Sequence, residues 1–216
     1  SLSFSVRPTV LLRKKQSKTA QFFKRWSTQT ALRLDNKIAD NKDLSNYNPF
    51  VSVRDSLLLA TNNNIRQSVF FNQSSAVFGA DYTYIDNRSK QLLTNGLEGK
   101  RLESHEIKWR FNFFKAWSVN SSNTVSNKLN NSQFFSSRNY AIKSFESEQR
   151  LIFQPNTVFR LSTIYKYNEK RNSASDARQQ AFMNTIALEL KYNQTDKGSL
   201  SGRCDFIRII YNDVEN

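Results

Sequence analysis

The sequence predicts an all-β fold, an antiparallel meander of about seven or eight long strands. The clearest observation is the stretch 103–119, where Ile107, Trp109, Phe111 and Phe113 alternate with polar and charged residues. Side chains of a strand point alternately to opposite faces, whereas neighbours on a helix lie only about 100° apart. The composition agrees, because 17 Phe and 8 Tyr accompany many Asn and Ser but only 5 Gly and 3 Pro. Such a chain is typical of strands joined by polar turns.

The alternation continues through Trp117 and Val119, so 103–119 is expected to be one strand, with Lys115 as the exception on its apolar side. Strands of globular proteins usually have about 5–6 residues. A strand that crosses a membrane needs about 9–11 residues and presents apolar side chains outward and polar ones inward. We therefore expect part of an outer-membrane-type β-barrel or a strongly curved sheet. A soluble β-sandwich remains an alternative, since any half-buried antiparallel sheet alternates.

Two strands are expected at the start of the chain. Residues 2–13 and 22–34 alternate at strand spacing, and 35–49 is Asp- and Asn-rich and predicts a loop. The composition of residues 1–34, basic and free of acids, also resembles a transit peptide, but Pro8 would break the amphipathic helix of such a peptide.

The next elements are less regular. Residues 50–59 predict a short strand or a helical turn, which Asn62-Asn63-Asn64 would end. Strand character returns over 67–85. A connection over 86–102 follows, and its Asn95-Gly96 pair is a strong signal for a tight hairpin.

The second half begins with a polar segment, 120–133, that predicts a loop. Four further strands are expected, separated by polar turns or loops at 154–156, 168–178 and 195–198; they are 139–153, 157–167, 180–193 and 199–211. Because no amphipathic helix separates them, neighbouring strands are expected to be antiparallel. No window of about 18 apolar residues predicts a transmembrane helix.

The alternation assigns candidate residues to each face of the sheet. The residues expected to face lipid are Ile107, Trp109, Phe111, Phe113, Trp117, Phe159, Leu161, Tyr165, Tyr167, Ile186, Leu188 and Leu190. The residues expected on the polar face, toward water or a lumen, are Lys108, Arg110, Asn112, Arg160, Lys166, Glu189 and Lys191. A cation would be costly on the lipid side, at about 2–4 kcal/mol near the bilayer midplane.

The net charge of +14, from 32 Lys and Arg against 18 acidic residues, makes nucleic acid, anionic lipid and anionic glycan candidate partners. Platforms that stack bases need aromatics and cations on one face, and here the two kinds of side chain separate. No specific nucleic-acid partner is therefore expected, and a soluble basic sheet that binds polyanions is the alternative function.

The sequence predicts no catalytic site, metal site or cofactor. The single Cys204 and single His105 provide neither a disulfide nor a Cys/His zinc site. Glu146 and Glu148 share a strand face, and Asp81 and Glu189 are further candidate carboxylates, but a solvated ion-paired face explains them better.

Several short runs resemble a family of large, mostly uncharacterised β-rich cell-envelope proteins of the Bacteroidota. The runs are 92–101, 132–135, 139–142, 159–162 and 165–167. The resemblance covers 45–212, and 1–44 only weakly, and is compatible with a single β domain, 1–216, that is a fragment of a larger barrel or sheet. It implies a Gram-negative outer-membrane or cell-surface location, outer-membrane lipid and other envelope proteins as partners, and a structural or transport-scaffold role without enzymatic activity.

Overall fold

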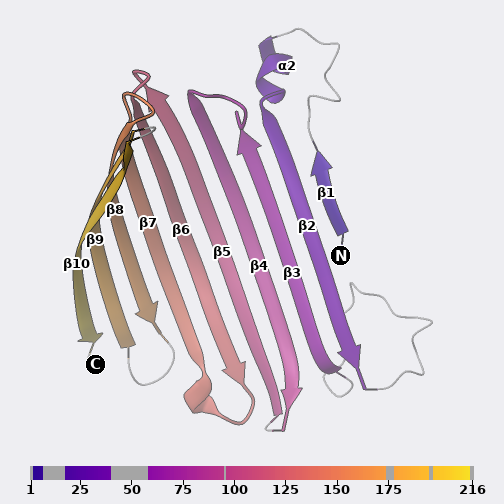
Figure 1. The fold of residues 1–216 in the computed structure, drawn as a ribbon. Helices are drawn as coiled ribbons and strands as arrows, with labels where there is room; N and C mark the ends of the chain where they lie inside the picture. Colours follow the sequence, from indigo (N-terminus) through magenta and orange to yellow (C-terminus); the bar gives the residue numbers. More distant parts are fainter. Residues whose placement is uncertain are drawn as a thin grey trace.

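The computed structural model describes residues 2–6, 18–39, 58–94, 96–173, 178–194 and 197–214. They form one antiparallel sheet of ten strands in which each strand pairs with its neighbours in the sequence (Figure 1). The order runs from β1 to β10 without a crossover, so these two strands are the edges of an open sheet. The predicted all-β antiparallel meander is confirmed.

Nine of the strands are long. The elements are β1 (Leu2–Val6), α2 (Lys18–Phe23), β2 (Trp26–Ile38), β3 (Leu58–Phe71), β4 (Phe78–Leu93), β5 (Gly96–Phe113), β6 (Trp117–Ser132), a 3-10 turn (Ser136–Arg138), β7 (Tyr140–Phe153), β8 (Phe159–Asn172), β9 (Arg178–Gln194) and β10 (Gly198–Val214). From β2 onward the strands have 13 to 18 residues, well above the length usual in globular proteins.

The expectation of one strand over 103–119 is wrong, because a tight turn divides it. Phe114 and Lys115 adopt φ of +51° and +50°, which reverses the chain between β5 and β6. Phe113 then pairs directly with Trp117, so the two rings point to the same face. The apolar residues before and after the turn therefore lie on the same face. Lys115 lies in the turn and not on the apolar face.

Several expected loops are also wrong. The polar segment 120–133 forms most of β6, the connection 86–102 forms parts of β4 and β5, and β3 runs straight through Asn62–Asn64. β2 continues over 35–38 and β8 over 168–172, where loops were expected. All of these segments except 35–38 pair with a neighbouring strand on both sides, and the two ladders of backbone hydrogen bonds outweigh the weak strand preference of Asn and Ser. Residues 35–38 pair with β3 alone. Ten strands therefore replace the expected seven or eight.

The expected hairpin is confirmed, whereas the strand expected over 22–34 begins later than predicted. The tight hairpin is present, with Leu93 pairing Gly96 at φ +92°. α2 occupies the start of the strand expected over 22–34. Some expected strands and loops lie wholly outside the described residues, namely those parts that fall on 7–13, 40–57 and 174–177.

Few apolar side chains are buried. Among the described residues the buried hydrophobic ones are Leu58, Ile152, Ile164 and Ala187, and most other buried side chains are small hydroxyls. Ile164 and Ala187 pair across β8 and β9 and are fully buried. The sheet is bent on its β8–β10 side (Figure 1), and most of its apolar surface is left uncovered.

Candidate functional site: the two faces of the sheet

The strand register defines two faces. Residues paired directly across antiparallel strands point to the same side. Trp109 pairs with Ala80 on β4 and with Ser121 on β6, and the same row continues through Gln149 to Tyr165. We call the side that carries Trp109 the aromatic face and the opposite side, which carries Lys108, the charged face.

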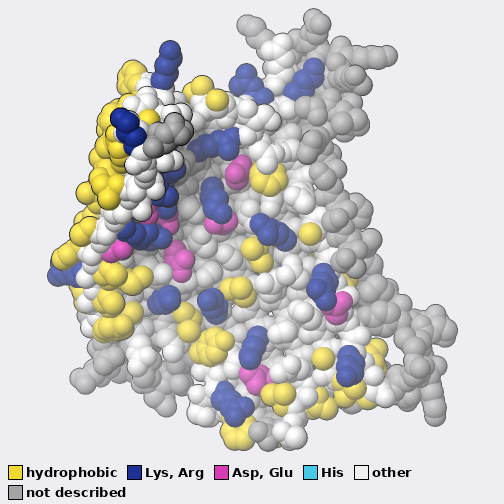
Figure 2. All heavy atoms as spheres, in the orientation of Figure 1, with side chains coloured by type: hydrophobic (Ala, Val, Ile, Leu, Met, Phe, Trp, Pro, Cys, Tyr) yellow, Lys and Arg dark blue, Asp and Glu magenta, His cyan; other side chains and the backbone are white. Residues whose placement is uncertain are grey.

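The register separates the two sets of residues predicted from the sequence. All twelve expected to face lipid lie on the aromatic face: Ile107, Trp109, Phe111, Phe113, Trp117, Phe159, Leu161, Tyr165, Tyr167, Ile186, Leu188 and Leu190. All seven expected on the polar side lie on the charged face: Lys108, Arg110, Asn112, Arg160, Lys166, Glu189 and Lys191. Figure 2 shows cations and carboxylates spread over the side of the sheet turned to the viewer.

The aromatic face is exposed. Ile107 is 52% exposed, Leu188 48% and Trp109 36%. Large contiguous apolar surfaces of this kind are rare on soluble monomers and mark contact with a membrane or another protein.

Three successive rows of the aromatic face contain no Lys, Arg, Asp or Glu among the described strands. They are the rows through Phe113, Phe111 and Trp109, and the last of them crosses every strand from β2 to β10. We call these three rows the apolar band. Most side chains in it are aromatic or aliphatic, and the remainder are Ser, Thr, Gln, Gly and Cys.

Aromatic rings line one end of the apolar band, where the short turns join the strands. Trp26 contacts Phe71 at a ring-centroid distance of 5.0 Å, and Trp117 contacts Phe153 at 4.6 Å. Phe153 in turn lies 6.3 Å from Phe159. These rings come from β2, β3, β6, β7 and β8, so they follow the edge of the sheet across several strands. Belts of aromatic side chains are typical of the membrane–water boundary of transmembrane sheets.

A charged row lies on the same face beyond the apolar band, toward the other end of the strands. Asp86 pairs with Glu103, and Lys143 pairs with Arg171. Asp86 is only 3% exposed and accepts hydrogen bonds from Arg88 (Nη2–Oδ2 2.6 Å) and Arg101 (Nε–Oδ1 3.3 Å). Ionic side chains on this face are thus concentrated outside the apolar band.

Two departures from the partition were not anticipated. On the aromatic face, Asn123 and its neighbours form a polar cluster in which Ser147 Oγ donates to Asn123 Oδ1 at 2.8 Å, and Arg208 is exposed on the edge strand β10. On the charged face of β10, Ile207 and Ile209 are 55% and 49% exposed. Both departures lie next to the apolar band or at the sheet edge.

Ion pairs link neighbouring strands of the charged face. Lys166 Nζ lies 2.8 Å from Glu148 Oε2, and Arg203 Nη1 lies 2.7 Å from Glu189 Oε1. Lys108 is paired with Glu106 on its own strand at 2.7 Å. Much of the charged face is therefore ion-paired, as expected for a surface in water.

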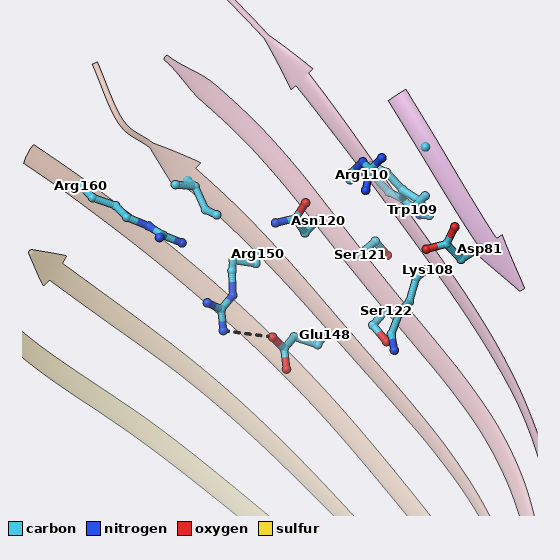
Figure 3. A pocket seen from close by; sticks show the side chains of 12 residues that line it. Asp81, Lys108, Trp109, Arg110, Asn120, Ser121, Ser122, Glu148, Arg150 and Arg160 are labelled. Carbon is cyan, nitrogen blue, oxygen red and sulfur yellow. Dashed lines mark hydrogen bonds and ion pairs between the residues drawn. The ribbon is translucent and has the colours of Figure 1, made fainter. Parts of the chain in front are cut away.

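A hollow of about 350 Å³ opens on the charged face of β4 to β8 (Figure 3). Its polar lining includes Arg110, Asn120, Arg150 and Arg160. Arg110 Nη2 donates to the backbone carbonyls of Gln73 and Ser75, which hold it in place. The sequence did not predict Asn120 and Arg150 as site residues. Asn120 lies in a polar segment that predicts a loop, and nothing in the sequence distinguishes Arg150 from the other charged residues of its strand. Continuing the alternation through Val119 would have placed Asn120 on the charged face.

Three of the four candidate carboxylates named from the sequence, Glu146, Glu148 and Glu189, are engaged with neighbours. The fourth, Asp81, lines the hollow. Glu148 is paired with Lys166 and lies 3.4 Å from Arg150, and Glu146 accepts a hydrogen bond from Asn168 at 3.1 Å. Within the described residues, no three His, Cys, Asp or Glu side chains gather where a metal could be held. The same part of the chain has no helix of the length and apolarity needed to cross a membrane.

Comparisons with protein-family models, curated proteins and solved structures find no match for this chain.

Proposed function

We propose that the chain is a structural or transport-scaffold segment of a bacterial outer-membrane β protein, without enzymatic activity. The aromatic face contacts lipid and the charged face contacts water. The observation that carries this proposal is the apolar band, three exposed rows free of ionic side chains, set against an ion-paired opposite face.

The length of the uncharged stretch on β9 supports the proposal. On β9 the aromatic-face residues are uncharged from Phe182 to Tyr192. Glu169 on β8 pairs with Phe182, and Arg208 on β10 pairs with Asn184, so at the end near the charged row this stretch is uncharged on β9 but not on both neighbouring strands. At about 3.4 Å per residue this stretch is about 34 Å long, and a strand tilt of about 40° reduces its height to about 26 Å. The apolar belt of outer-membrane barrels is about 25 Å tall. The aromatic rings at one end and the charged row at the other fit the two boundaries of such a belt.

The resemblance to envelope proteins of the Bacteroidota supports the same location, the outer membrane or cell surface, with lipid and other envelope proteins as partners. The rival function, a soluble module for polyanions, is less well supported. Carboxylates such as Glu106, Glu148 and Glu189 interrupt the cations of the charged face, and a long polyanion would meet repulsion there.

Cys204 provides a direct test, because it is the single cysteine and lies exposed on the aromatic face of β10. A polarity-sensitive fluorophore attached to Cys204 is expected to shift to shorter wavelength in reconstituted vesicles and to be quenched by brominated lipid. The three tryptophans, Trp26, Trp109 and Trp117, all lie on the aromatic face, so the tryptophan fluorescence of the unlabelled protein is expected to be quenched in the same vesicles.

The matched control moves the label by three residues to the other face. In the double variant Cys204→Ser, Ser201→Cys the label lies on the same edge strand but on the charged face, and it is expected to remain in water and unquenched. Equal emission and equal quenching at the two positions would show that the faces do not divide lipid from water, and the proposal would be abandoned.

A further inference from the structure

Two cations of the charged face face each other without a compensating acid. Arg160 on β8 pairs directly with Lys191 on β9. Neither has an ion-pair partner in the part of the chain that the structure describes. Like charges directly opposite each other destabilise a sheet, so this position favours an anion.

The nearest carboxylate on the same strand is already engaged. Glu189 lies two residues from Lys191 on the same face, but it pairs with Arg203 at 2.7 Å and with Arg150 at 3.9 Å. The pair with Arg150 is long, and the second contact of Arg150, to Glu148, is 3.4 Å. A guanidinium has five N–H donors, so Arg150 retains donors that can bind a further group.

The hollow brings these free donors together. Arg160 and Arg150 enter it from β8 and β7, and the side chain of Asn120 lies between Arg150 and Arg110 (Figure 3). The side chain of Asn120 has no hydrogen-bond partner among the described residues, while its backbone pairs with β5 and β7. The hollow thus contains donors from three neighbouring strands and more cations than carboxylates, since Asp81 and Glu148 face Lys108 and three arginines.

We propose that this hollow binds the phosphate group of a small soluble molecule, with Arg160, Arg150 and Asn120 as donors. Lys191, which pairs with Arg160 across β8 and β9, adds positive charge beside them. Arginine pairs with phosphate through two parallel hydrogen bonds. A phosphate monoester carries about −1.5 to −2 charges near pH 7, which matches the two uncompensated cations. The volume of about 350 Å³ lies at the lower end of the range of small-ligand sites, about 300–1,000 Å³, and suits a molecule of the size of a sugar phosphate.

Titration calorimetry on the full chain in nonionic detergent micelles tests the proposal. The probes are inorganic phosphate and glucose 6-phosphate, with glucose as the uncharged comparison. Saturable binding of one phosphate-bearing probe per chain is expected, with no heat from glucose. Because no lipid bilayer is present, this result does not depend on which face meets lipid, and it can fail while the proposed function stands.

Three variants at two arginines distinguish binding at a defined site from attraction by the net charge. Arg160→Gln is expected to weaken binding at least about tenfold. Arg160→Lys keeps the charge but loses the two parallel N–H donors of the guanidinium, and it is expected to weaken binding less. Arg208→Gln removes the same charge from the opposite face of β10 and is expected to leave binding unchanged. Absence of saturable binding in the parent chain, or equal weakening by Arg160→Gln and Arg208→Gln, would overturn the proposal.

Discussion

At the scale of single residues, Asp86 is the clearest case of a side chain whose surroundings fix its charge. It lies in the charged row, outside the apolar band. Burial raises the pKa of Asp86, but the hydrogen bonds from Arg88 and Arg101 together outweigh burial and lower it below the usual value. A carboxyl whose pKa is lower in the folded state stabilises the fold above its unfolded pKa, and this contribution is lost as the pH falls through the folded pKa.

We therefore expect Asp86→Asn to lower the free energy of unfolding by about 2 kcal/mol near pH 7. This is less than the ~3–5 kcal/mol for breaking a fully buried pair, because both arginines are partly exposed and can be rehydrated. The variant should also lose less stability than the parent chain on acidification. Denaturant titration at several pH values measures both effects. Asp35→Asn, at an exposed pair with Arg33, is the control and should change stability by less than about 1 kcal/mol.

At the scale of elements, β6 shows how a polar strand is held in the centre of a sheet. Ser126 on β6 and Ser144 on β7 are both buried, and their hydroxyl oxygens lie 2.7 Å apart. Ser126→Ala is expected to cost about 1–3 kcal/mol of unfolding free energy, because Ser144 is left without its partner.

The double variant Ser126→Ala, Ser144→Ala tests that reason. Removing both hydroxyls leaves no unpaired group, so stability should return close to that of the parent chain. Denaturant unfolding of the parent, the two single variants and the double variant gives the coupling energy. Additive losses would mean that the hydroxyl pair does not hold β6 and β7 together.

The same strand shows where sequence reasoning succeeds and where it stops. Alternating bulky apolar residues, as from Ile107 to Phe113, identify both a strand and its faces, because one face must avoid water. In β6 only a few apolar residues such as Val119 and Val125 mark the alternation, and the stabilising partners are backbone groups and hydroxyls of neighbouring strands. Those partners are distant in sequence, so the strand was mistaken for a loop. The hollow was missed for the same reason, since Asn120 belongs to this segment.

At the scale of the whole molecule, a face arises only when the register aligns many strands. The alternation within each strand predicts which residues share its sides, and the pairing of Phe113 with Trp117 and of Trp117 with Phe153 joins those sides into one surface. The sequence predicted the partition of the nineteen candidate residues but not the charge-free rows, the aromatic edge or the charged row, which depend on strand-to-strand alignment. These features decide what the surface contacts.

The final prediction distinguishes lipid from water on that surface. Phe111→Arg places a cation in the apolar band. It is expected to lower the free energy of unfolding of the vesicle-reconstituted protein by about 2–4 kcal/mol. Asn112→Arg, the next residue on β5, places the same cation on the charged face and should change stability by less than about 1 kcal/mol. Phe111→Leu removes the ring contact with Phe113 while keeping an apolar side chain, so the excess loss in Phe111→Arg measures the cost of the charge. Tryptophan fluorescence during denaturant titration in vesicles follows all three variants. If Phe111→Arg and Phe111→Leu lose equal stability, the aromatic face does not lie in hydrocarbon, because a cation buried in hydrocarbon costs more free energy than a leucine at the same position.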